Sequence, residues 1–210
     1  MARYLTEFIG TFFLVLTVGL TVVGGTPMAP LAIGSALMIM VYMGGHVSGG
    51  HYNPAVSIAV GAHGALSWGD VVLYVASQLL GGLLATVVVF VVTDSTFAAA
   101  PTVGMTGALL IEILFTFALV LVILNTAVSE ATKGNSYYGL AIGFTIVVAA
   151  FAGGPFSGGA FNPSVGLMPA LGGALLGDAA IGPVWLYLVG PVVGGLLAVP
   201  VFAMQERARG

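Results

Sequence analysis

The sequence predicts an all-α integral membrane protein with six membrane-spanning helices and two half-helices, arranged as two inverted repeats of three spans each. Composition gives the first indication, because 59% of the 210 residues are hydrophobic and 5% are charged, against about 25% charged residues in soluble domains. So few charges cannot cover a surface that faces water. The second indication is an internal repeat. Residues 31–58 aligned with residues 140–167 match at twelve of twenty-eight positions, including the Asn-Pro pairs that begin at Asn53 and Asn162.

The six spans follow from hydrophobic runs along the chain. A spanning helix needs about 20 predominantly apolar residues, and such runs occur at 5–24, 29–45, 70–92, 107–127, 138–153 and 183–204. The first run is too long for a signal-peptide core and no small-residue cleavage signature follows it, which predicts a retained helix. Half-helices are expected at 53–61 and at 162–171. Residues 1–210 then form one membrane domain, with a first repeat at 1–105 and a second at 106–210.

The repeat extends from the Asn-Pro pairs into the long spans. Glu-Phe-Ile-Gly-Thr-Phe at 7–12 corresponds to Glu-Ile-Leu-Phe-Thr-Phe at 112–117, and Gly-Gly-Leu-Leu-Ala occurs at both 81–85 and 194–198. Because three is an odd number of crossings, the second unit crosses the membrane in the opposite direction to the first. Transport sites in such inverted repeats lie near the midplane, at the interface of the two units.

The basic residues predict the orientation, since cytoplasmic segments collect Lys and Arg. With six spans, all four basic residues fall on one side: Arg3, Lys133, Arg207 and Arg209. The connections around 25–28, 94–103 and 172–182 contain none. Both termini are therefore expected in the cytoplasm, in a plasma or inner membrane.

Each Asn-Pro pair predicts the start of a short helix. Asn is a preferred N-cap, and Pro fits the first helical position because its missing N–H has no partner there. The apolar run that follows is about nine residues, roughly 14 Å, or half of the ~30 Å hydrocarbon core. Ordinary capping of two buried helices is the alternative. Two inverted copies, in the motifs Asn53-Pro54-Ala55 and Asn162-Pro163-Ser164, favour half-helices that meet inside the membrane.

Glycine-rich segments at 44–50 and 153–159 lead to the two motifs and are expected to be extended. Irregular backbone survives in a bilayer only where protein buries it or where it lines a water-filled cavity. The sequence therefore predicts a pore whose wall is a ladder of backbone carbonyls, contributed by Gly49, Gly50, His51, Gly158 and Ala160. The Asn amides would add donors at the centre. The positive end of each half-helix, about half a charge, disfavours cations there.

Two Asn-Pro-Ala-like motifs, each preceded by Ser-Gly-Gly, resemble those of the aquaporin and aquaglyceroporin channel family, and the resemblance covers essentially the whole chain. It implies a passive channel for small uncharged solutes that excludes ions, needs no cofactor and forms homotetramers with one pore in each protomer. Glu7 and Glu112 lie inside apolar spans, where a carboxylate suggests a function. The resemblance implies that they hold the backbone of the glycine-rich segments. A proton relay is the alternative. His46 is predicted to be a neutral histidine hydrogen-bonded within its loop, with a pH-sensitive gate as the alternative.

The selectivity filter departs from the family pattern. Where most members carry an arginine after the second motif, this chain has Val165, and the spacing to the Asn residues assigns the other three positions to Ile33, Ala150 and Gly159. No charged or hydrogen-bonding side chain remains, so the ring is expected to be wide and apolar. It would pass water and larger neutral solutes: glycerol, urea, hydrogen peroxide and undissociated metalloid hydroxides such as arsenite. Gly166 stands where glycerol channels carry Asp.

Other function classes find little support in the sequence. No constellation of nucleophile, acid, base or metal ligands predicts an enzyme or a metal site, and the net charge of −3 without a basic cluster argues against nucleic acid. The chain has no cysteine. The remaining alternatives are a channel mainly for water and a proton-coupled secondary transporter, for which Glu7 and Glu112 are the candidate coupling groups.

Overall fold

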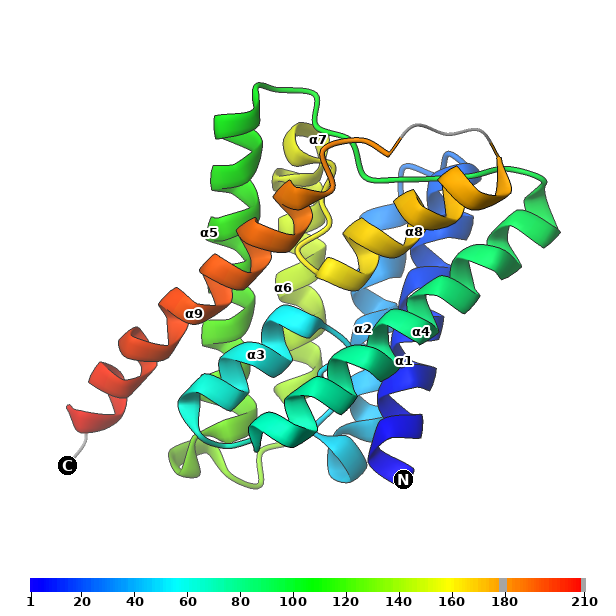
Figure 1. Cartoon of the computed structure of the whole chain (residues 1–210). Helices are drawn as coiled ribbons and strands as arrows, with labels where there is room; N and C mark the ends of the chain where they lie inside the picture. The colour runs from blue at the N-terminus through cyan, green and yellow to red at the C-terminus, as the bar shows by residue number, and fades with distance from the viewer. Residues whose placement is uncertain (178–180, 209–210) are drawn as a thin grey trace.

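The computed structural model describes residues 1–177 and 181–208, and these residues form helices joined by short connections, with no strand (Figure 1). The α-helices are α1 (Ala2–Val23), α2 (Ala29–Ser48), α3 (Pro54–His63), α4 (Trp68–Thr93), α5 (Met105–Ile123), α6 (Tyr138–Ala152), α7 (Gly154–Ser157), α8 (Pro163–Leu176) and α9 (Trp185–Arg207). A π-helical segment, Leu124–Val128, extends α5, and a short 3-10 helix, Glu130–Thr132, follows it. The predicted all-α membrane fold is confirmed.

Five helices of the described chain are long and apolar enough to cross a membrane: α1, α2, α4, α5 with its π-helical extension, and α9. The span predicted at 138–153 is α6, which has 15 residues and is continued by the single turn α7. Residues 178–180 of the connection predicted at 172–182, and the predicted cytoplasmic Arg209, lie outside the described residues. The repeat boundaries at 1–105 and 106–210 stay a prediction.

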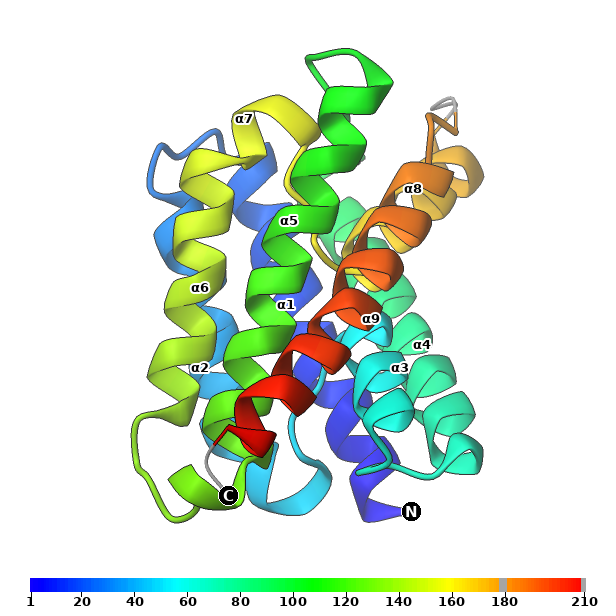
Figure 2. The same ribbon diagram turned by 90° about the vertical axis from the view of Figure 1, so that its left-hand side faces the viewer.

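The two short helices connect the halves of the chain. Most long helices pack within their own half, α1 on α4 and α5 on α9, while α2 packs on α6 across the two halves. The half-helices also cross over: α3 packs mainly on α9, and α8 packs mainly on α4. Figures 1 and 2 show α3 and α8 in opposite halves of the molecule with their N-terminal ends pointing toward its middle. Each short helix is thus held by a long helix of the other half.

Small residues allow the long helices to approach closely at equivalent places. A Cβ added at Gly81 of α4 would overlap the Phe8 carbonyl of α1, and a Cβ added at Gly194 of α9 would overlap the Ile113 carbonyl of α5. Without a hydrophobic driving force between helices in lipid, such close backbone packing stabilises the bundle. The repeated Gly-Gly-Leu-Leu-Ala sequence is therefore a packing motif.

The glycine-rich segments are less extended than the sequence predicts. Residues 44–48 complete α2, residues 154–157 form α7, and each helix ends at a glycine with φ of 90°, Gly49 or Gly158. The irregular backbone therefore begins only at these two glycines. The helix α8 also runs past the expected end at residue 171, to Leu176, and includes Pro169. Tertiary packing overrides the local weakness of glycine and proline in helices.

Candidate pore

The N-terminal ends of α3 and α8 are joined by reciprocal hydrogen bonds. The Asn53 side chain caps α3 by accepting from the Ala55 N–H, and its Nδ2 donates to the Phe161 carbonyl at 2.9 Å. Asn162 caps α8 in the same way through the Ser164 N–H, and its Nδ2 donates to the Tyr52 carbonyl at 2.9 Å. Each asparagine therefore fixes its own helix and the loop before the other helix.

The residues that precede the asparagines have an unusual backbone conformation. Tyr52 and Phe161 both have φ of 49°, in the left-handed region that non-glycine residues seldom adopt. Their carbonyls receive the asparagine amides of the opposite half, and their N–H groups are bonded to Glu7 and Glu112. These bonds hold the N–H and the carbonyl of each of the two residues and thereby compensate the strain of the conformation.

The two intramembrane glutamates bind the loops. Glu7 accepts from the Ser48 hydroxyl at 2.7 Å, from the His51 N–H at 3.0 Å and from the Tyr52 N–H at 2.7 Å. Glu112 makes the equivalent bonds with Ser157, Ala160 and Phe161 at 2.7, 3.1 and 2.6 Å. Both glutamates are fully buried. The two glutamates therefore accept hydrogen bonds from loop N–H groups and leave the loop carbonyls to other donors.

Six loop carbonyls accept no hydrogen bond from the described chain, three in each loop: those of Gly49, Gly50, His51, Gly158, Gly159 and Ala160. A buried carbonyl without a protein partner requires water or another donor. The N–H groups of these loops are occupied while the carbonyls are not. These six carbonyls are available acceptors, and their role as a pore wall stays a prediction.

The first half carries a polar network that the second half lacks. Gln78 Nε2 donates to Glu7 at 2.8 Å and to the Ser57 hydroxyl at 2.9 Å, and this hydroxyl lies 3.1 Å from His51 Nδ1. Ser57 and Gln78 are not among the predicted site residues, although a glutamine in the middle of an apolar span is a detectable signal. Their equivalents in the second repeat are Gly166 and Pro191, which have no polar side chain.

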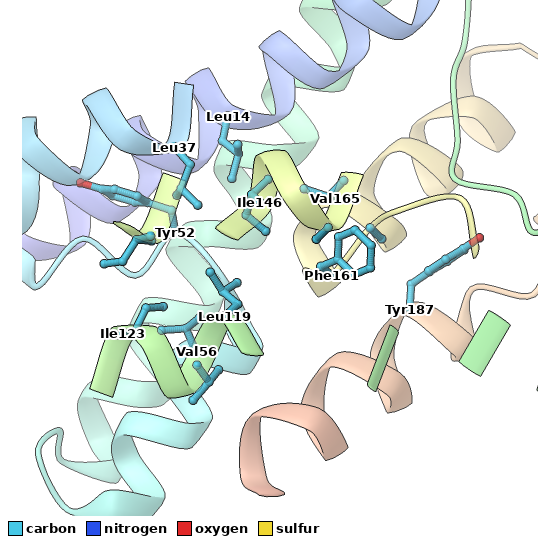
Figure 3. Close-up of a cluster of buried hydrophobic side chains, with 14 of the residues drawn as sticks. Leu14, Leu37, Tyr52, Val56, Leu119, Ile123, Ile146, Phe161, Val165 and Tyr187 are labelled. Carbon is cyan, nitrogen blue, oxygen red and sulfur yellow. The ribbon is translucent and has the colours of Figure 1, made fainter. Parts of the chain in front are cut away.

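A cavity of about 330 Å³ runs through the region where the half-helices meet. It is lined by Asn53 and Asn162, by the loop residues His51, Gly158 and Ala160, and by all four residues of the predicted filter, Ile33, Ala150, Gly159 and Val165. The other lining side chains are mostly aliphatic. Figure 3 shows several of them, including Leu14, Leu37, Leu119, Ile123 and Ile146. Among the described residues that line it, only His51, Asn53 and Asn162 carry polar side chains.

Several predicted site residues do not line the cavity. Pro54, Ala55, Pro163 and Ser164 form the first turns of α3 and α8, and Glu7 and Glu112 lie behind the loops. None of these six residues lines the cavity, and neither do Gly49 and Gly50. His46 is exposed and also lies outside the lining.

The neighbourhood of Val165 has no room for the acidic residue of glycerol channels. A Cβ added at Gly166 would overlap the Tyr187 Cβ, and the Tyr187 hydroxyl donates to the Ser157 carbonyl at 2.6 Å. The tyrosine therefore fills the space beside the second motif and supports the loop that contains Gly158 and Gly159. The valine at the predicted filter position and the filled neighbouring site occur together.

One part of the wall was not predicted at all. Residues 97–100 of the α4–α5 connection, Phe-Ala-Ala-Ala, line the same cavity as the predicted filter residues. The available signal was their composition, because an apolar run without charges is unusual for a connection exposed to water. From the sequence, the connection is expected only to face away from the cytoplasm, because it contains no Lys or Arg.

Known proteins share this sequence pattern and architecture. The family model described as "Major intrinsic protein" matches residues 1–202. The chain belongs to the major intrinsic protein family. It is 37% identical over 204 residues to "Probable aquaporin NIP4-2" of Arabidopsis thaliana, an alignment that covers 91% of this chain and 70% of the relative. It is 33% identical over 210 residues to "Glycerol uptake facilitator protein-like 6" of Lactiplantibacillus plantarum, with 94% and 95% covered.

Among solved structures, the aquaglyceroporin from Plasmodium falciparum matches with a TM-score of 0.82 at 24% identity, over 96% of this chain and 94% of that one. This likeness shows the shared fold. Members of the major intrinsic protein family are channels and not enzymes, so this chain is a multi-pass membrane protein that passes water and small solutes passively.

Proposed function

We propose that this major intrinsic protein is a wide channel for neutral solutes, which passes glycerol, urea, hydrogen peroxide and undissociated metalloid hydroxides such as arsenite in addition to water. One observation carries the proposal: the four filter positions line the same cavity as the central asparagines, and none of the four offers a hydrogen-bonding side chain. Pore diameter and lining groups determine selectivity in such channels. An aliphatic ring without a guanidinium neither narrows the path nor favours water over larger solutes.

In the proposed mechanism, the loop carbonyls and the asparagine side chains have different roles. Solutes would exchange hydrogen bonds with water for bonds to the free loop carbonyls, and would meet the asparagine amides at the centre. The N-terminal ends of α3 and α8 both face that centre and contribute positive partial charge, which opposes the passage of cations. We assign Glu7 and Glu112 the role of holding the loops, because each already accepts three or four hydrogen bonds and neither lines the cavity.

The expected assembly follows from the family, and the expected orientation follows from the basic residues. We infer a homotetramer with a separate pore in each protomer and with both termini in the cytoplasm. The alternatives to the proposed solute range are a channel mainly for water and, less compatible with the engaged glutamates, a proton-coupled transporter.

Stopped-flow light scattering on proteoliposomes tests the proposal with water, glycerol, urea and arsenous acid, each with and without a proton gradient. The decisive variant is Val165→Arg, because its guanidinium would place five N–H donors and a long side chain in the filter. Water flux should persist while glycerol, urea and arsenous acid fluxes fall steeply. Val165→Leu, which adds bulk without charge, serves as the matched control and should have a smaller effect on every solute.

Three results would contradict the proposal. A wild-type protein that passes water but none of the larger solutes would be a water channel. A flux that follows the proton gradient would identify a transporter. If well-folded Val165→Arg keeps the wild-type ratio of glycerol to water permeability, Val165 does not lie at the constriction.

A further inference from the structure

The first residues of α1 and α4 are joined at the end of the molecule that carries the N-terminus (Figures 1 and 2). Asp70, in the first turn of α4, is the centre of this contact. Its carboxylate accepts from an Arg3 guanidinium nitrogen, from the Tyr4 hydroxyl and from the Ser67 hydroxyl, each at 2.8 Å. We call Arg3, Tyr4 and Asp70 the clasp.

Aromatic rings connect the clasp with the cavity. The Tyr4 ring lies edge-on to the Tyr74 ring with centroids 5.9 Å apart, and the Tyr74 ring lies edge-on to His51 with centroids 5.3 Å apart. Tyr74 is fully buried, and its hydroxyl donates to the Ser48 carbonyl at 2.8 Å. His51 lines the cavity. A continuous line of side chains therefore leads from the surface to the candidate pore.

The His51 ring is held between two supports. Its Nδ1 lies 3.1 Å from the Ser57 hydroxyl, and the Tyr74 ring packs on it from α4. The two other polar side chains of the cavity lining, Asn53 and Asn162, are fixed by their crossing hydrogen bonds. Displacement of Tyr74 would remove one support of the imidazole. The ring would then be free to turn into the cavity and occupy space that a large solute needs.

The second half of the chain has no equivalent of the clasp. Tyr187 corresponds to Tyr74, and its hydroxyl donates to the Ser157 carbonyl as the Tyr74 hydroxyl does to Ser48. In the repeat, however, the counterparts of the clasp residues have no charge and no hydrogen-bonding side chain: Ala108, Leu109 and Pro183. The counterpart of His51 is Ala160. The clasp therefore occurs only in the half whose loop places an imidazole in the cavity lining.

We propose that Arg3, Tyr4 and Asp70 are positioning residues for the pore: the clasp holds Tyr74, and Tyr74 keeps the His51 ring against the cavity wall. This role rests on the channel proposed above, in which solutes pass through the cavity. A broken clasp releases the ring, which lowers the flux of large solutes more than the flux of water. Because partly exposed ion pairs are weak, the expected decrease in glycerol flux is about two- to fivefold.

A double-mutant cycle tests this role. Arg3→Gln and Asp70→Asn are each made in the wild-type chain and in His51→Asn, where a polar group near the position of Nδ1 remains and most of the ring is gone. Glycerol and water fluxes are measured in proteoliposomes. In the wild-type background both clasp variants should lower glycerol flux by the stated factor. In the His51→Asn background neither should change it, because a cycle isolates the effect that two residues share.

Two further variants are matched controls. Arg3→Lys keeps the positive charge beside Asp70 and should retain most of the glycerol flux. Lys133→Gln removes a basic residue from the same end of the molecule and breaks its exposed ion pair with Glu130, but leaves the clasp intact. It should leave both fluxes unchanged. Thermal unfolding in detergent, measured for every variant, separates a change in flux from a loss of folded protein.

Two results would overturn the role of the clasp. Equal losses of glycerol flux in the two backgrounds would mean that the clasp supports the fold and does not act through His51. Unchanged flux in both clasp variants would mean that the clasp does not position the ring. If neither variant folds, Tyr4→Phe, which loses only the hydroxyl bond to Asp70, is compared in the same two backgrounds. A wild-type chain without glycerol flux would contradict the wide filter alone, and the same comparison of water flux would then decide the role of the clasp.

Discussion

Each central asparagine combines two functions in one side chain. Its carbonyl oxygen caps a half-helix, and its amide nitrogen bonds to the loop of the other half, at Phe161 for Asn53 and at Tyr52 for Asn162. An amide places an acceptor oxygen and a donor nitrogen on separate atoms of one short side chain. Aspartate would keep the cap and lose the crossing bond, and serine would be too short to provide both.

Asn162→Asp should weaken ion exclusion. The new carboxylate would lie between two helix N-termini and would attract cations or hold a proton, because the positive partial charges there favour an anion. We expect a cation leak to appear while neutral solutes still pass, measured by proteoliposome conductance beside glycerol flux. Asn125→Asp, which introduces the same charge at the end of α5 away from the cavity, is the control and should not leak. A tight Asn162→Asp channel with normal glycerol flux would count against the pore.

At the scale of elements, the glutamates determine the shape of the two loops. Each glutamate gathers donors from a serine hydroxyl and from two consecutive N–H groups, so both loops turn their donors away from the cavity. The loop backbone groups that have no partner in the described chain are consequently acceptors. Glu7 has one further partner, Gln78, which links the first loop to α4 and to Ser57 of α3.

Replacement of either glutamate by alanine should destabilise the protein more than it alters selectivity. Each buried donor left without an acceptor costs about 1–3 kcal/mol. Glu7→Ala should be the more damaging variant, because Glu7 accepts from four groups and Glu112 from three. Thermal unfolding in detergent and folded yield measure the effect, with exposed Glu130→Ala as the control. A normally stable Glu7→Ala channel that has lost dependence on a proton gradient would instead support a transporter.

The sequence predicts the helices well where periodicity and capping are strong. Both short helices begin at the proline after an asparagine cap, as expected. The sequence predicts helix ends less well where tertiary packing determines them. Gly44 and Gly45 remain helical within α2, and α8 continues through Pro169 to Leu176. A glycine-rich pattern cannot reveal that Gly44 packs directly beside Tyr52. The contribution of residues 97–100 was hidden for a similar reason, since it depends on contacts between segments distant in sequence.

At the scale of the molecule, the two halves support one another through their short helices. Neither Asn53 nor Asn162 finds its crossing partner within its own half, and α3 and α8 pack on long helices of the other half. The cavity therefore exists only when both halves are assembled. The inverted arrangement also determines which termini and connections lie on the same side of the membrane. This conclusion does not depend on the family resemblance.

The orientation in the membrane follows from that arrangement and from the few basic residues. Both termini and the α5–α6 connection lie at one end of the molecule, and the α4–α5 connection lies at the other (Figure 1). Arg3, Lys133 and Arg207 belong to the first end, and cytoplasmic segments collect such charges. We therefore expect a membrane-impermeant maleimide to label Val103→Cys in intact cells. Ala131→Cys, beside Lys133, should react only after the membrane is permeabilised.

The two exposed positions serve as controls for one another, because the chain has no other cysteine and both variants are small changes on connections. The reverse pattern of labelling would mean that the basic end faces outward, against the charge rule. Labelling of both variants in intact cells would indicate a mixed orientation, in which four basic residues are too few to determine how the chain inserts. In that case, Ala131→Lys should restore a single orientation, since each added cytoplasmic charge strengthens the preference for one orientation in the membrane.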